Sequence, residues 1–134
     1  AGIVTITASF IGESTITMTS AWTSTYAETV KKVHIEVRPA AVKLNWVRSP
    51  DTGKMRVRWT KSSFAVGYQV QYAASRSFSG SKRTKWIKDR STYYCTFKKM
   101  SSGTTRYVRV RTFKVINGKS YYSKWSNIVS VKIK

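Results

Sequence analysis

The chain has 134 residues and a net charge of +20, with 25 lysines and arginines against five acidic residues. Its length provides a core for one domain of about 100 residues and part of another, but not for two complete domains. No run approaches the roughly 20 apolar residues of a membrane-spanning helix, so no membrane insertion is expected. Because the sequence starts at Ala1 without a charged and apolar leader, it is expected to be a soluble piece of a longer protein.

The charge changes sharply near Pro39, since the whole net charge falls on residues 41–134. That stretch carries 22 basic and two acidic side chains, whereas the residues before it carry three of each. Such a break predicts a domain boundary. We therefore expect a partial segment over residues 1–39 and a complete domain over residues 40–134, joined by a short hinge that Pro39 stiffens.

Three strands are predicted in the first segment from alternating polar and apolar residues. They cover residues 3–8, 15–19 and 30–37. Gly12 and Glu13 suit a tight connection, and residues 24–28 suit a looser one. Because three strands leave one apolar face and two edges open, we expect a cover from the second domain or from a strand of another copy of the chain.

Three stretches of this segment resemble the closing strands of a bacterial immunoglobulin-like repeat. They are AGIVTITA at residues 1–8, the triplet TYA at residues 25–27, and residues 33–37 followed by Pro39. The resemblance implies that the segment is the C-terminal part of such a repeat.

Seven short strands are predicted in the second segment. In one of them Met55, Val57 and Trp59 alternate with basic residues, which is typical of a half-buried antiparallel strand. Asn117-Gly118 is the strongest hairpin signal. The strands cover residues 42–46, 55–59, 68–72, 84–88, 92–97, 107–113 and 127–134. Short strands with this spacing favour a two-sheet antiparallel sandwich over a barrel.

Five motifs, in this order, closely resemble a fibronectin type III domain over about residues 41–134. They are VRW at 57–59, GYQVQY at 67–72, MSSGT at 100–104, YVRVR at 107–111 and YSKWS at 122–126. The stretch looks most like the lysine-rich variety in cell-surface proteins of Gram-positive, Clostridia-like bacteria. The resemblance implies an all-β fold, an immunoglobulin-like antiparallel β-sandwich, with about three additional N-terminal strands. It is specific for fold and not for activity.

One position departs from that family. The family usually places a tyrosine six residues after the apolar residue that precedes the glycine turn, and here the count from Met100 reaches Arg106. Either Arg106 holds the corner, or Tyr107 does so with a shifted register. We favour Arg106, because Val108 and Val110 would otherwise face the wrong way.

The residue types that catalysis needs, five acids, one histidine and one cysteine, are scattered along the chain. The sequence therefore predicts neither enzyme activity nor a cofactor or metal site. Cys95 is the only cysteine, and it is expected to be a small core residue without a histidine partner. His34 and Glu36 share a strand face, but a third metal ligand is missing, so they are interpreted as a surface polar pair. Glycine-rich phosphate loops and catalytic triads are absent from the sequence.

A basic face with interleaved aromatic residues is the main candidate site. It consists of Tyr107, Arg109, Arg111 and Phe113 pointing outward, with Gln69 and Gln71 on a neighbouring strand, Lys124 and Trp125 in the loop before the last strand, and Trp86 on an exposed edge. Two interpretations stay open: a structural ladder with Trp125 between the two arginines, or a groove for an anionic polymer. The ladder resembles the Trp-Ser motif of related receptor domains.

We therefore expect a non-catalytic extracellular module of a bacterial surface protein, acting as a spacer, stalk, filament component or adhesion module. One alternative is a binder of anionic polymer such as teichoic acid, glycan or nucleic acid, since the charge exceeds what solubility requires. Another is an accessory module of a cell-wall or carbohydrate hydrolase. Self-association through the N-terminal strands is a further possibility, and sequence-specific binding of nucleic acid is not expected.

Overall fold

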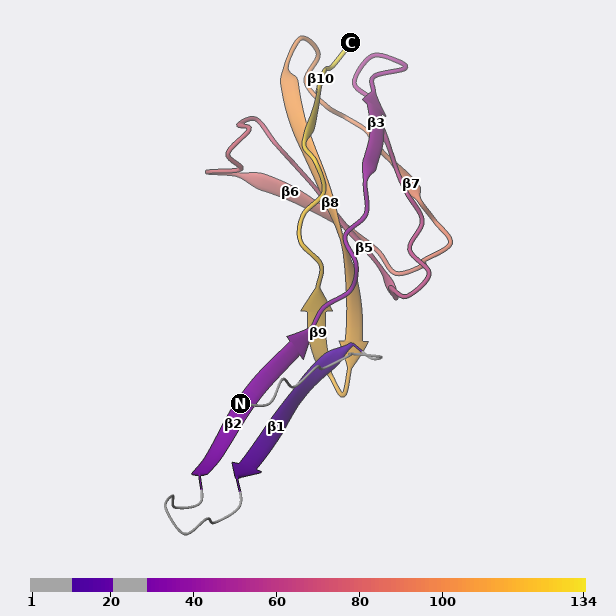
Figure 1. Cartoon of the computed structure of the whole chain (residues 1–134). Coiled ribbons are helices and arrows are strands. Elements are labelled where there is room, and N and C mark those ends of the chain that lie inside the picture. Colours follow the sequence, from indigo (N-terminus) through magenta and orange to yellow (C-terminus); the bar gives the residue numbers. More distant parts are fainter. Residues whose placement is uncertain (1–10, 21–28) are drawn as a thin grey trace. The chain divides into compact units, whose positions relative to one another are not determined.

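The computed structural model describes residues 11–20 and 29–134 and divides the chain into two units, Ala1–Arg38 and Pro39–Lys134. The regular elements within those described ranges are all β-strands (Figure 1). They include no helix with the length and hydropathy that crossing a membrane would require. The strand predicted at residues 3–8 and the connection predicted at residues 24–28 lie outside the described residues.

The first unit contains an antiparallel hairpin of β1 (Gly12–Ser20) and β2 (Thr29–Val37). Both strands were expected from their alternation, and the structure confirms them. The predicted tight connection at Gly12 and Glu13 is wrong, because these residues belong to β1 and pair with Val37 and Glu36. Backbone pairing therefore extends further toward the N-terminus than the Thr and Ile alternation of β1 indicated.

The second unit is a sandwich of two antiparallel sheets, which confirms the predicted fold class. Its strands are β3 (Leu44–Arg48), β4 (Met55–Trp59), β5 (Gly67–Ala73), β6 (Lys82–Ile87), β7 (Tyr94–Phe97), β8 (Thr105–Ile116), β9 (Lys119–Tyr122) and β10 (Val129–Lys132). One sheet has the order β3-β4-β7 and the other the order β10-β8-β5-β6, with β9 also paired to β8 (Figure 1). β9 and β10 thus pair with different parts of the long strand β8, on the same side of that strand.

The core lies between the two sheets and is built by strand alternation. Val57 of β4, Val70 of β5 and Val108 and Val110 of β8 are fully buried. Basic residues of β4 alternate with its buried ones and remain exposed, as the sequence predicted. Burial of apolar side chains at about 25 cal/mol per Å² is the main stabilising contribution to this unit.

β3 contains an irregularity that changes the direction of its side chains. Strict alternation along the predicted strand would place Trp46 on the inward face of Leu44, but the register to β4 shifts between these two residues. Val47 consequently takes the buried position, and Trp46 is only half-buried. A β-bulge of this kind redirects the side chains that follow it.

The hairpin between β8 and β9 follows the Asn117-Gly118 prediction. Both residues have positive φ angles, 51° and 76°, as a two-residue type I′ turn requires.

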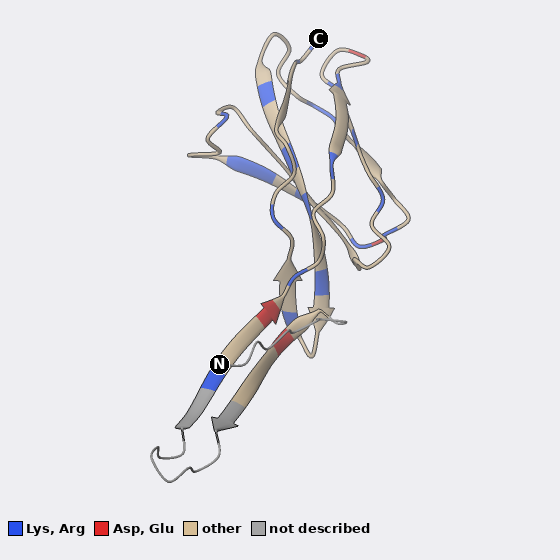
Figure 2. Ribbon diagram, in the orientation of Figure 1, with Lys and Arg blue, Asp and Glu red and all other residues tan. Residues whose placement is uncertain are grey.

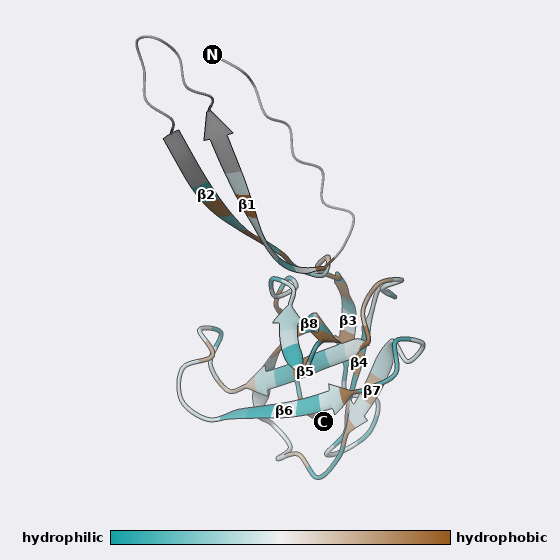
Figure 3. Ribbon diagram, turned by 90° about the horizontal axis from the view of Figure 1, so that it is seen from below, coloured by the Kyte–Doolittle hydropathy of each residue, from teal (hydrophilic) through white to brown (hydrophobic). Residues whose placement is uncertain are grey.

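The open edge of the larger sheet is formed by β6, whose residues are mainly hydrophilic (Figure 3). Exposed charged side chains on an edge strand oppose pairing with another chain.

Candidate functional site

The segment between β9 and β10 interrupts the edge strand but stays hydrogen-bonded to β8. The backbone N–H of Thr112 donates to Ser123 Oγ at 3.0 Å, and the N–H of Val110 donates to Ser126 Oγ at 3.0 Å. The N–H groups of the two serines donate in turn to the carbonyl oxygens of Thr112 and Val110. The hydroxyl groups of the two serines therefore accept the β8 hydrogen bonds that backbone carbonyl groups of a continuous edge strand would accept. The loop between the two serines carries Trp125.

Trp125 lies within an alternating stack of aromatic rings and guanidinium groups, which we name the arginine ladder: Phe78, Arg109, Trp125, Arg111 and Tyr122. The Cζ atom of Arg109 is 4.0 Å from the ring centres of both Phe78 and Trp125. The Cζ atom of Arg111 is 4.4 Å from the Trp125 ring and 3.9 Å from the Tyr122 ring. Each such cation–π contact stabilises by about 0.5–1 kcal/mol, and by more when the cation is desolvated.

Two glutamines of β5 fix the guanidinium groups of the arginine ladder. Arg109 Nε and Nη2 donate to Gln71 Oε1 at 3.1 and 2.9 Å, and Arg111 Nε donates to Gln69 Oε1 at 2.6 Å. Burial, and then the charge of Arg111, lowers the pKa of Arg109 from its ordinary value. The two arginines are thus held by protein groups on several sides, an arrangement that rigidifies the sheet.

The other residues of the predicted basic face are placed as follows. Lys124 is exposed and Tyr107 is half-buried outside the arginine ladder. Phe113 follows Arg109 and Arg111 in the alternation of β8, but it is only 6% exposed, because the Trp86 ring packs edge-on against it at 5.2 Å. Trp86 itself lies on the edge strand β6, is 44% exposed and also contacts Tyr122 at 6.2 Å. The rings of Trp86 and Phe113 therefore extend the arginine ladder as an aromatic cluster.

Comparison with solved structures shows which fold the sandwich has. It matches the fn3 domain of human collagen alpha-1(XX) chain with a TM-score of 0.57 and 15% identity, covering 72% of this chain and 86% of that one. The fold is fibronectin type III-like. The fn3 domain of human contactin 1 matches with a TM-score of 0.56 and 13% identity over 74% of this chain and 82% of that one.

A chain described as a myokine matches the same fold, with a TM-score of 0.55 and 17% identity over 72% of this chain and 97% of that one. Neither a family model nor a curated protein matches the sequence. At these identities the likeness establishes the fold alone.

Two members of the arginine ladder were not predicted. Phe78 lies in the Ser/Gly-rich connection between β5 and β6 with a φ of 56°, and it is buried against Arg109. No periodic signal marks a residue in such a loop. Tyr122, by contrast, is the first residue of the YSKWS motif that contains Trp125, so the sequence did offer a signal for it.

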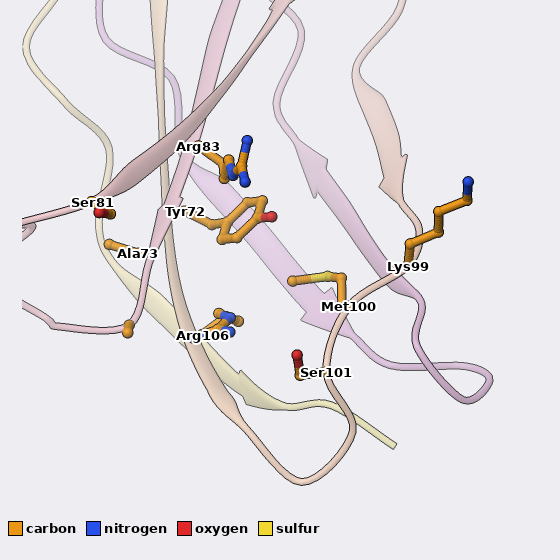
Figure 4. Close-up of a pocket in the computed structure, with 9 residues that line it drawn as sticks. Tyr72, Ala73, Ser81, Arg83, Lys99, Met100, Ser101 and Arg106 are labelled. Atoms are coloured by element: carbon orange, nitrogen blue, oxygen red, sulfur yellow. The ribbon is translucent and has the colours of Figure 1, made fainter.

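The corner of the fibronectin type III-like unit holds Arg106, on the inward face that it shares with Val108 and Val110. Its Nε atom is buried and has no hydrogen-bond partner among the residues that the structure describes. Arg106 borders a cavity of about 290 Å³ (Figure 4). The other residues that line this cavity are Tyr72, Ala73, Ala74, Ser81, Arg83, Lys99, Met100 and Ser101. Arg106 therefore occupies the predicted position, but its Nε makes no hydrogen bond that would tie the corner together.

The two reactive side chains that the sequence singled out, Cys95 and His34, are placed as follows. Burial raises the pKa of the Cys95 thiol to about 12, although the charge of Lys85 opposes this shift, so the thiol is a poor nucleophile near neutral pH. The expected pairing of His34 with Glu36 is not the one observed, because His34 Nε2 lies 3.8 Å from Glu13 Oε2. Residues 11–20 and 29–134 contain no group of three or more potential metal ligands.

The positive charge of the fibronectin type III-like unit is largely uncompensated, with Lys and Arg distributed along β6 and β8 (Figure 2). Its only two acids, Asp51 and Asp89, are already engaged. Asp51 forms an ion pair with Lys54 at 3.0 Å. The Asp89 carboxylate accepts hydrogen bonds from the Ser91 backbone and the Thr92 hydroxyl, which lower its pKa.

Proposed function

We propose that the chain is a non-catalytic structural and adhesion module of an extracellular bacterial surface protein, acting as a spacer or stalk. The observation that carries this proposal is the arginine ladder. Its arginines are the cationic groups that a binding face would need, yet they contact aromatic rings and glutamines of the same unit. The fold supports a structural role, and the resemblance to lysine-rich bacterial surface domains supports the location.

Substitution of the ladder arginines tests this role. We expect Arg109→Ala and Arg111→Ala each to lower the free energy of unfolding by about 1–2 kcal/mol, because each variant loses two cation–π contacts and the hydrogen bonding to a glutamine of β5. Urea denaturation measures this change, and retention on bacterial cell walls measures attachment. Arg76→Ala, which removes an exposed charge elsewhere, serves as the control. Loss of attachment with unchanged stability in the ladder variants would refute the structural role.

A second candidate function, binding of an anionic polymer, is favoured by the charge of the unit. Two acids cannot neutralise 22 basic side chains, and the resulting charge exceeds the roughly 2–8 charges that a small soluble domain needs. Polyanions are therefore attracted at low salt through counterion release.

Selectivity at higher salt tests the second function. We expect the chain to bind heparin or teichoic acid, and not a neutral glucan, at about 50 mM salt and to retain measurable binding at about 200 mM. Isothermal titration calorimetry with these polymers and with double-stranded DNA provides the measurement. If binding disappears equally for every polyanion at the higher salt, the attraction is non-specific and the structural role stands alone.

A further inference from the structure

A second surface that combines arginines with aromatic residues lies on the outer face of the three-stranded sheet. The backbone register aligns Trp46, Arg58 and Tyr94 in one row across β3, β4 and β7, and Arg48, Arg56 and Thr96 in the next row. A groove of about 430 Å³ follows this face, and we name it the sheet groove. Its lining residues are Trp46, Arg56, Arg58, Tyr93, Tyr94 and Thr96.

The cations of the sheet groove lack anionic partners within the fibronectin type III-like unit. Arg56 of the groove stands directly opposite Arg48, which lies beside the groove on β3, and like charges in such a pair are destabilising. The two acids of the unit are used by Lys54 and by the loop before β7. An external anion would therefore relieve a repulsion that the sequence has placed on this face.

The arginines of the sheet groove differ from those of the arginine ladder in their hydrogen bonds. Arg109 and Arg111 donate to glutamines. Arg56 and Arg58, both exposed, donate no side-chain hydrogen bond within residues 11–20 and 29–134. Their N–H groups remain available for the bidentate contacts that guanidinium groups make with carboxylates and sulfates.

The aromatic residues indicate which polymer fits. The Arg48 guanidinium lies over the Trp46 ring at 4.9 Å, and Arg58 and Lys61 lie over the Tyr93 ring at 5.1 and 5.5 Å. Those ring faces are occupied by cations, whereas nucleic-acid bases need a series of open ring faces for stacking. Tyr94 is 56% exposed, so a single ring is available for contact with a sugar.

We propose that the sheet groove binds an acidic polysaccharide, with Arg56 and Arg58 contacting its sulfate or carboxylate groups and Tyr94 contacting a sugar ring. The inference rests on the second proposed function and assigns it a site and a ligand class. It also moves that function away from Arg109 and Arg111, which the arginine ladder holds in place.

The test compares two double variants of equal charge. Arg56→Gln with Arg58→Gln removes the two groove cations, and Arg76→Gln with Lys88→Gln removes two exposed cations outside the groove. With heparin as the probe at about 200 mM salt, we expect roughly a tenfold loss of affinity for the groove variant and less than about a twofold loss for the control. Thermal unfolding verifies that both variants fold, and amide chemical shifts of β4 and β7 report where heparin binds.

Each other outcome overturns a defined part of the proposal. Equal losses in the two double variants, with amide shifts outside the three-stranded sheet, would reject the sheet groove while leaving polymer binding intact. Tighter binding of single-stranded DNA of matched charge, abolished by the groove variant, would replace the polysaccharide with nucleic acid. If wild type binds no polyanion at about 200 mM salt, the second function fails and the inference fails with it.

Discussion

Replacement of Gly67 by alanine is expected to destabilise the fibronectin type III-like unit by about 3 kcal/mol or more. Gly67 opens β5 between β6 and β8 and is buried. A Cβ atom there would overlap the backbone oxygen of Ile87 and come within 3.0 Å of Phe113 Cε1. Because the first obstacle is backbone, the strands would have to separate. Urea denaturation followed by tryptophan fluorescence measures the change in the free energy of unfolding.

Gly80→Ala is the matched control for this prediction. Gly80 lies in the connection between β5 and β6, and a Cβ atom there would meet nothing within 4 Å. Its φ of 72° still disfavours a side chain, by about 1–2 kcal/mol. If both alanine variants lose the same stability, the overlap with the Ile87 backbone does not have the effect expected for Gly67→Ala.

Trp59→Ala should lower the free energy of unfolding by about 3–5 kcal/mol, since it removes one of the largest fully buried side chains. Trp59 ends β4 and is 1% exposed, and its ring centre lies 5.3 Å from that of Tyr68. Neighbouring strands cannot move in to fill the cavity without breaking the backbone hydrogen bonds between them. Calorimetric unfolding provides the measurement.

Trp59→Phe separates ring packing from the indole N–H. The Nε1 atom of Trp59 is buried and finds no hydrogen-bond partner within residues 11–20 and 29–134, and such a group is unfavourable by about 1–3 kcal/mol. Phenylalanine removes this donor together with part of the ring, so we expect a loss of less than half that of Trp59→Ala. A phenylalanine variant as unstable as the alanine variant would show that the unpaired donor carries no such penalty.

Alternation along the strands was sufficient to predict most of the sandwich. Met55 and Val57 of β4 and Val108 of β8 are buried as predicted, and Asn117-Gly118 makes the expected hairpin. These features depend on residues close together in the sequence. The direction of each side chain follows from the period of two once one inward residue is known.

The features that were missed depend on partners distant in the sequence. Trp46 faces outward because of a bulge against β4, and a single sequence does not reveal register shifts. Phe78 joins the arginine ladder from a loop whose composition is typical of an exposed connection. The sheet groove therefore escaped prediction although the outward arginines of β4 were recognised, since it requires Trp46 on the same face.

The hydrogen bonds at the two ends of the fibronectin type III-like unit also determine how it would carry mechanical load. At the C-terminal end of the unit, Lys134 is hydrogen-bonded to Ser49 and Gly53. It lies just beyond Lys132, which pairs with Thr105 at the first residue of β8. At the start of the unit, Ala40 accepts a hydrogen bond from Thr112, seven positions farther along β8. Tension between these ends runs parallel to the strands, so the ladder bonds resist it together in shear and not one after another by peeling.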